Sequence, residues 1–143
     1  MPLIWKDHLS IGNAVLDFEH QNLIGIINNI EYLINKNDIP SLLSAIELFK
    51  NCAHTHFANE ARFAQALNFN FEQHDLAHQH LLKELESTLS QLVGSDMLNE
   101  TWCKYAMEHY PKFLRDWFIE HINSKDMEMK PLLQSYPRDF KPA

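Results

Sequence analysis

The sequence predicts an all-α fold: an up-down-up-down four-helix bundle with an N-terminal arm and a short C-terminal extension. The 143-residue chain has only three glycines and six prolines, and most lie near its ends or between long periodic segments. Apolar residues recur at spacings of three and four in four such segments, the pattern of amphipathic helices in a bundle. This length favours a single domain, with residues 1–16 as the arm, 17–126 as the bundle and 127–143 as the extension.

The first two expected helices have well-defined apolar faces. The first runs from Asp17, interpreted as its N-cap, to Asn37. Its face contains Leu23, Ile24, Ile27, Ile30, Tyr32 and Ile34. The second helix opens at Pro40 and Ser41, a favourable pair for a first turn. Its face contains Leu42, Ile46, Phe49, Ala53, Phe57, Phe63 and Leu67.

The third expected helix follows a turn at residues 68–70, where Asn70 and Gln73 resemble a capping pair. Gly94 and Ser95 are expected to stop it. Its apolar face contains Phe71, Leu81, Leu82, Leu85, Leu89 and Leu92.

The fourth expected helix runs from about Met97 to Asn123. Its face contains Leu98, Trp102, Ala106, Phe113, Leu114, Trp117 and Phe118. Pro111 removes one backbone hydrogen bond, so we expect it to kink the helix near residues 107–110 or to split the helix in two. The tail at residues 134–143 is expected to be loose or laid on the surface.

Charge and cysteine usage exclude several classes of protein. The net charge of −7 comes with no basic cluster, so a nucleic-acid backbone would be repelled. The N-terminus has no basic region followed by an apolar run, and no stretch has the apolar length that a bilayer requires. Cys52 and Cys103 lie far apart and outside any CxxC pattern, which favours two reduced thiols. We therefore expect a cytoplasmic protein that binds neither nucleic acid nor membrane.

Nine histidines are the unusual feature of the composition. Six polar side chains continue the apolar rows and are expected to point into the core. They come from all four helices: His20, His56, Glu60, His74, His78 and His121. A single histidine on an apolar face is more often a hydrogen-bonded core residue than a ligand. Together, however, so many buried polar groups would be costly without partners, and a metal centre explains them economically.

Asp126 is a further candidate ligand. It follows His121 by five residues, which is about 140° around a regular helix. The helix must therefore loosen before Asp126, and we expect this at Asn123 and Ser124, both weak helix formers. The remaining histidines have no partner at ligand spacing and are interpreted as non-ligands: His8, His54, His80 and His109.

Five imidazoles and two carboxylates favour a pair of iron ions. They are too many for one tetrahedral zinc ion, and calcium or magnesium would prefer oxygen ligands. Two bridging carboxylates would leave the imidazoles to divide three against two, so that one iron keeps an open position. Few anionic ligands favour reversible dioxygen binding over oxygen cleavage. The open side is expected to have an apolar lining: Leu23, Phe57, Trp117, Phe118 and Ile122.

These ligands belong to a series of motifs that spans nearly the whole chain: Trp5 with Ser10-Ile11-Gly12, Asp17-x-x-His20, His56-Phe57-x-x-Glu60, His74-x-x-x-His78 and Trp117-x-x-x-His121-Ile122-x-x-x-Asp126. In this series the chain closely resembles the bacterial hemerythrins. The resemblance implies a four-helix protein with a non-heme di-iron site that binds dioxygen reversibly.

The resemblance also implies a role for each ligand. The six-coordinate iron would take three histidines: His74, His78 and His121. The open iron would take His20 and His56, and both irons would share Glu60, Asp126 and an oxo or hydroxo group. The chain departs from the family pattern at Ala61, where a second acid is usual, and at Pro111.

Dioxygen binding without catalysis, for carriage, storage, delivery or sensing, is the leading interpretation. Two alternatives stay open. A di-iron enzyme would act on nitric oxide or peroxide at the same site. A regulatory module would use the oxidation or ligation state of the site to alter an unidentified protein partner.

Overall fold

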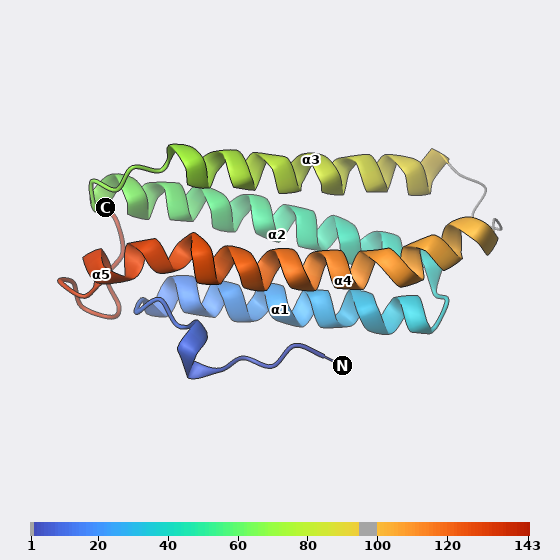
Figure 1. The fold of residues 1–143 in the computed structure, drawn as a ribbon, viewed down its shortest axis with the longest axis horizontal. Coiled ribbons are helices and arrows are strands. Elements are labelled where there is room, and N and C mark those ends of the chain that lie inside the picture. Colours follow the sequence, from blue (N-terminus) through green and yellow to red (C-terminus); the bar gives the residue numbers. More distant parts are fainter. Residues whose placement is uncertain (1, 95–99) are drawn as a thin grey trace.

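The computed structural model describes residues 2–94 and 100–143, and the side chains of residues 2–90 and 109–143. Within these ranges the chain forms helices and no strands. Four long helices lie side by side and alternate in direction (Figure 1): α1 (Ala14–Asn35), α2 (Ile39–Ala66), α3 (Glu72–Gly94) and α4 (Glu100–Ser124). Three short elements flank them: η1 (Asp7–Leu9), η2 (Asp126–Met129) and α5 (Lys130–Leu133). This is the expected four-helix bundle, in which α1 packs against α2 and α4, and α2 packs against α3.

The start of α1 differs from the expectation, because Asp17 is not its N-cap. Asn13 caps the helix and accepts hydrogen bonds from two backbone amides of the first turn. The buried Asp17 carboxylate instead accepts from the Ser10 hydroxyl at 2.5 Å and from the Ile11 amide at 2.9 Å. Gly12 completes this turn with a φ of +88°, a conformation that favours glycine. Asp17 therefore ties the N-terminal arm to the bundle.

The two tight connections explain why neighbouring helices run antiparallel. Each contains an asparagine with a φ of 54°, Asn37 between α1 and α2 and Asn68 between α2 and α3. Asparagine tolerates this left-handed conformation better than most residues. Asp38 then caps α2 by accepting a hydrogen bond from the Ser41 amide at 3.2 Å, so α2 begins where the Pro40–Ser41 pair predicted.

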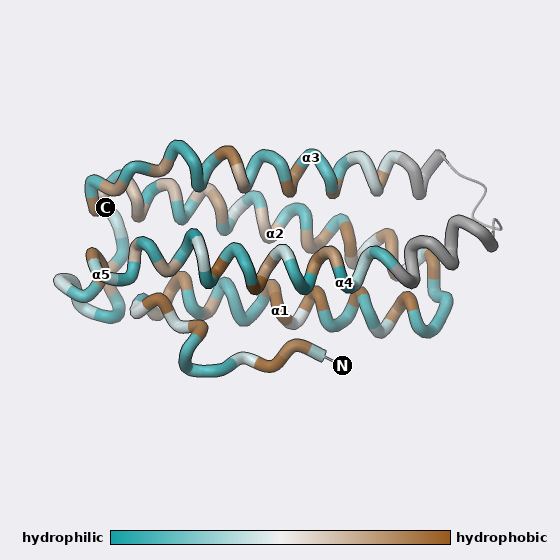
Figure 2. Tube along the Cα trace, in the orientation of Figure 1, coloured by the Kyte–Doolittle hydropathy of each residue, from teal (hydrophilic) through white to brown (hydrophobic). Residues whose placement is uncertain are grey.

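The bundle core confirms most of the expected apolar rows among the side chains described, as the alternation of hydrophobic and hydrophilic residues in Figure 2 illustrates. Tyr32 is the exception on α1, because it is 57% exposed. It lies two residues from both Ile30 and Ile34, about 200° around the helix, so it faces away from them. The expected boundaries at Ser95 and Met97 lie outside the described residues. The side chains at four expected apolar positions also lie outside those described: Leu92, Leu98, Trp102 and Ala106.

Pro111 lies inside α4, which is one helix from Glu100 to Ser124. The expectation that proline splits this helix is therefore wrong, and a kink remains a prediction. The physical reason is that proline removes only one backbone hydrogen bond from a 25-residue helix. Leu114 and Phe118 are buried, whereas Phe113 and Trp117 are half-buried.

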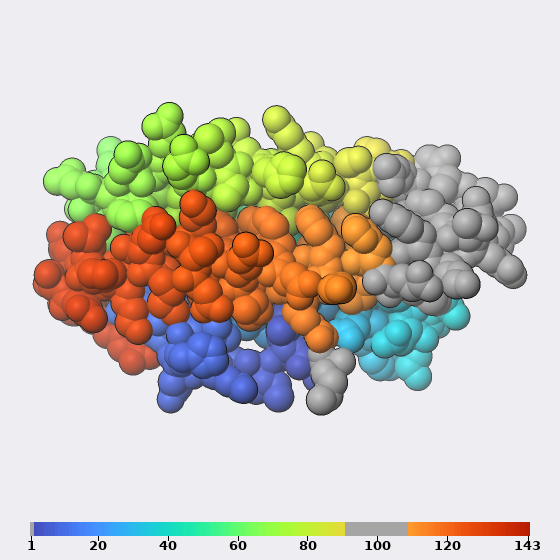
Figure 3. All heavy atoms as spheres, in the orientation of Figure 1, coloured from blue at the N-terminus to red at the C-terminus, as the bar shows by residue number. Residues whose placement is uncertain are grey.

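The C-terminal tail is anchored rather than loose. The Ala14 amide donates to the Arg138 carbonyl at 2.8 Å, and the Asn13 side chain donates to the Phe140 carbonyl at 2.9 Å. The Phe140 ring packs edge to face on Phe63, with centroids 5.8 Å apart. The tail thereby completes a second small core formed by Ile11, Leu16, Phe63, Ala64, Leu67, Met129 and Leu133. Figure 3 shows the C-terminal residues, in red, covering one end of the bundle.

None of the helices in the described part of the chain combines the length and apolarity needed to cross a membrane.

Candidate metal centre

Seven polar side chains meet in the core of the bundle. They come from all four long helices and from η2: His20, His56, Glu60, His74, His78, His121 and Asp126. None of them is more than 6% exposed. The structure therefore brings together every residue that the sequence marked as a candidate ligand. The four histidines interpreted as non-ligands are exposed and lie outside this cluster: His8, His54, His80 and His109.

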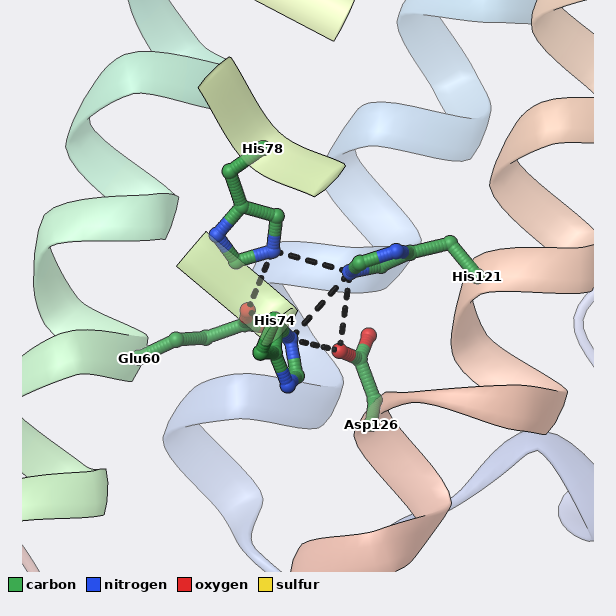
Figure 4. A group of neighbouring side chains, drawn as sticks. All are labelled: Glu60, His74, His78, His121 and Asp126. Atoms are coloured by element: carbon green, nitrogen blue, oxygen red, sulfur yellow. Dashed lines mark hydrogen bonds and ion pairs between the residues drawn. The ribbon is translucent and has the colours of Figure 1, made fainter. Parts of the chain in front are cut away.

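The seven residues form two overlapping groups that share Glu60 and Asp126. The group in Figure 4 adds three histidines: His74, His78 and His121. The other group adds His20 and His56. Within each group the nearest ligand atoms all lie within 4.8 Å of one another. The histidines thus divide three against two around the shared carboxylates.

The Glu60 carboxylate turns one oxygen toward each group. Its Oε1 lies 2.7 Å from Nε2 of His56 and 3.2 Å from Nε2 of His20. Its Oε2 lies 3.1 Å from Nε2 of both His74 and His78. This division of oxygens is the arrangement of a carboxylate that bridges two ions.

The Asp126 carboxylate repeats the division from the opposite side of the cluster. Its Oδ2 lies 3.0 Å from Nε2 of His20, and its Oδ1 lies 2.8 Å and 3.2 Å from Nε2 of His74 and His121. The end of α4 makes this possible. The helix stops at Ser124, whose hydroxyl donates to the Glu120 carbonyl, and the 3-10 helix η2 begins at Asp126 after a single turn residue, Lys125. The helix therefore loosens before Asp126 as expected, but at Lys125 and not at Asn123 and Ser124, which are still helical.

The donor atoms converge on common points, and several of them lie within hydrogen-bond distance of more than one other ligand atom. Among the described residues, no hydrogen bond of acceptable geometry reaches Oδ1 of Asp126, although Nε2 of His74 is only 2.8 Å away. Ligands at right angles around an ion about 2.1 Å away would be separated by about 3 Å. Most of the separations in the cluster are close to this value. The donor set and its geometry therefore fit two first-row transition ions.

Comparison with known proteins points to one family. The chain is 28% identical over 132 residues to a bacteriohemerythrin of Clostridium acetobutylicum, covering 87% of this chain and 96% of that protein. It is 27% identical over 133 residues to a hemerythrin of Sipunculus nudus, covering 92% and 94% of the two chains. A bacteriohemerythrin of Stenotrophomonas maltophilia is 22% identical over 140 residues, covering 96% and 86%. No protein-family model matches the chain.

The chain is similar to hemerythrins over most of its length. The alignments cover most of each relative's length, so the similarity is not confined to one segment of the bundle.

Within the cluster, the histidines and carboxylates shift one another's pKa values. Burial raises the pKa of Glu60 and Asp126, but the surrounding histidines lower it further, well below the usual range. Burial lowers the pKa of His56, yet the charge of Glu60 brings it to about 10. Close contacts with the same two carboxylates bring the pKa of His74 to about 9 against the effect of burial. His78 behaves oppositely, because burial dominates and lowers its pKa to about 4.

Three of the five apolar residues expected to line the site have rings in contact with ligand histidines. Phe57 stacks on the His78 ring with centroids 3.6 Å apart, and Trp117 stacks on the His121 ring at 4.5 Å. Both rings therefore pack on the three-histidine group, and the Phe57 ring also lies 5.9 Å from the His56 ring. The two-histidine group has Phe118 edge-on to His20, with centroids 5.8 Å apart. Leu23 and Ile122 are buried in the same core.

The sequence did not point to Glu19, which touches the site from outside. Its Oε1 accepts a hydrogen bond from Nδ1 of His56 at 2.9 Å. Its position in the sequence could have indicated this contact, because Glu19 lies three residues after the buried Leu16 and four before the buried Leu23. It therefore borders the buried row of α1, where a carboxylate requires a partner.

Proposed function

We propose that this chain binds dioxygen reversibly at a non-heme di-iron centre and is not an enzyme. The single observation that supports this most is the pair of carboxylates that share their oxygens between groups of three and two buried histidines. Its relatives carry the names bacteriohemerythrin and hemerythrin. A cytoplasmic location remains a prediction from the sequence.

The proposed ligands are those that the two groups contain. One iron is assigned three histidines, His74, His78 and His121. The other iron is assigned His20 and His56, and both are assigned Glu60 and Asp126. The second iron has one fewer histidine, which leaves a position for a small ligand.

Two ferrous ions would supply the electrons and the open position that dioxygen requires. The protein supplies the surroundings. Phe118 places a buried apolar ring next to His20 of the two-histidine half, which keeps water away from this side of a reduced site. Phe57 and Trp117 stack on ligand rings of the other half and restrict their rotation. With only two carboxylates among seven ligands, high-valent iron is poorly stabilised, which favours binding over oxygen cleavage.

The test is a cycle of oxygenation. The iron-loaded protein is reduced without air, exposed to oxygen and then depleted of it, while its visible spectrum is recorded. A charge-transfer band that appears and disappears over repeated cycles is the expected result. Rapid irreversible oxidation, or turnover with nitric oxide or peroxide, would contradict reversible binding in favour of an enzyme.

A further inference from the structure

Glu19 connects α1 to the two-histidine half of the site through His56. The His56 ring has its two nitrogens engaged on opposite sides, Nε2 lying 2.7 Å from Glu60 and Nδ1 lying 2.9 Å from Oε1 of Glu19. Oε2 of Glu19 accepts a second hydrogen bond from the Asn59 side chain at 2.6 Å. The Glu19 carboxylate is therefore held at both oxygens, by two residues of α2.

This support is asymmetric within the cluster. The Nδ1 atoms of His20, His74 and His78 are buried and have no hydrogen-bond partner among the described residues. Metal-binding histidines commonly donate their second ring N–H to a carboxylate or carbonyl, which sets the ring orientation and the tautomer. Among these four histidines, only His56 has such a carboxylate, and it belongs to the group with fewer histidines.

The surface next to Glu19 explains why His56 requires this support. A cleft of about 270 Å³ opens between α1 and α2, and Glu19, Leu23, Cys52 and His56 are among the residues that line it. The outer side of His56 thus borders a solvent-accessible space, whereas His20 is enclosed by the core. Without Glu19, water would compete for Nδ1 and the ring would be free to turn.

We propose that Glu19, held by Asn59, is a positioning residue that orients His56 and keeps its proton on Nδ1, leaving Nε2 free to bind a metal ion. A neutral imidazole carries one proton, and the nitrogen that holds this proton cannot bind metal. A carboxylate acceptor at Nδ1 therefore selects the binding tautomer. The proposal rests on the metal centre proposed above but not on dioxygen as its ligand.

The test is an anaerobic titration of the metal-free protein with ferrous ion, in which calorimetry measures the affinity of each binding step. The wild-type protein should bind two ions. In Glu19→Ala, one binding step should weaken by about 10- to 100-fold, the usual effect of losing such a partner, while the other step stays within a few-fold of wild type. Glu19→Gln should retain most of the affinity, since its amide oxygen still accepts from Nδ1. Asn59→Ala should shift the same step by a smaller factor, and it provides a second variant if Glu19→Ala does not fold.

Glu31→Ala is the matched control. Glu31 lies on the same helix, has a similarly half-buried carboxylate and pairs with Arg115 at 2.7 Å, away from the ligands. This variant should leave both binding steps unchanged. If Glu19→Ala weakens both binding steps equally, Glu19 has only a general structural role and the proposal is wrong. If the affinities of both steps are unchanged, Glu19 does not position His56. Failure of the wild-type protein to bind two ions would instead contradict the proposed centre itself.

Discussion

Nε2 of His78 lies 2.8 Å from Nε2 of His121, although the two residues are 43 positions apart and belong to different helices. At this distance an N–H of one ring can donate to the nitrogen of the other. A single such hydrogen bond does not account for the third ring, because Nε2 of His74 also lies 3.2 Å from Nε2 of His121. Three nitrogen atoms therefore converge on one region next to two carboxylates. Helix packing alone gives no reason for this convergence, whereas a bound metal ion does.

Removal of one ligand tests the centre directly. His74→Ala should lower the iron content because it removes one of three histidines from its group, and Glu60→Ala should lower it further because both groups share Glu60. Iron is measured by atomic absorption after loading and gel filtration, and circular dichroism checks the fold. His54→Ala is the control, since this exposed residue of the same helix as Glu60 lies outside the cluster. Two irons retained in both ligand variants would refute the assignment.

The metal-free protein should lose stability as the pH rises. The pKa values of His56 and His74 are raised from 6.5 to about 10 and about 9. Their protonated forms therefore stabilise the fold fully below pH 6.5, and this stabilisation disappears as the pH rises through 9 and 10. Urea unfolding at pH values from 6.5 to 10 measures the loss.

Metal loading should remove this dependence, because metal ions bind neutral imidazoles and displace the protons. Loading near neutral pH should thus acidify a weakly buffered solution. Identical alkaline profiles with and without metal would contradict the charge assignment.

Asp17→Ala should destabilise the protein by about 1–3 kcal/mol. The substitution leaves the Ser10 hydroxyl and the buried Ile11 amide without their acceptor and frees the N-terminal arm. Urea unfolding measures the change, and protease digestion reports on the release of the arm. Asp38→Ala, which removes only an exposed helix cap, should cost about 1 kcal/mol without exposing the arm. An unchanged digestion pattern in Asp17→Ala would show that other contacts hold the arm.

Phe118→Ala should shorten the lifetime of the oxygenated form at least several-fold, because it opens the apolar surface next to His20 to water. Phe63→Ala is the matched control, since Phe63 is equally buried but belongs to the second small core. Both variants should lose about 3–5 kcal/mol of stability. Only Phe118→Ala should accelerate autoxidation, which is followed by the decay of the visible band. Equal acceleration in both would indicate a general loss of stability as the cause.

Much of the site was predictable because each helix repeats its own geometry. His56 and Glu60, or His74 and His78, lie four residues apart and therefore share a face of one helix. The position of this face follows from the apolar residues around it. The loosening before Asp126 was also predictable, since five residues of regular helix would turn its carboxylate away from His121.

The sequence by itself determined four amphipathic helices and the six polar residues on their buried faces, because the helical period relates neighbours along one helix. Tertiary structure alone decided which oxygen of Glu60 faces which histidines, that Asp17 holds the N-terminal arm, that Glu19 supports His56 and that Phe140 closes the end of the bundle. These are contacts between separate segments, and their geometry depends on how the segments pack against each other. No spacing along the chain encodes them.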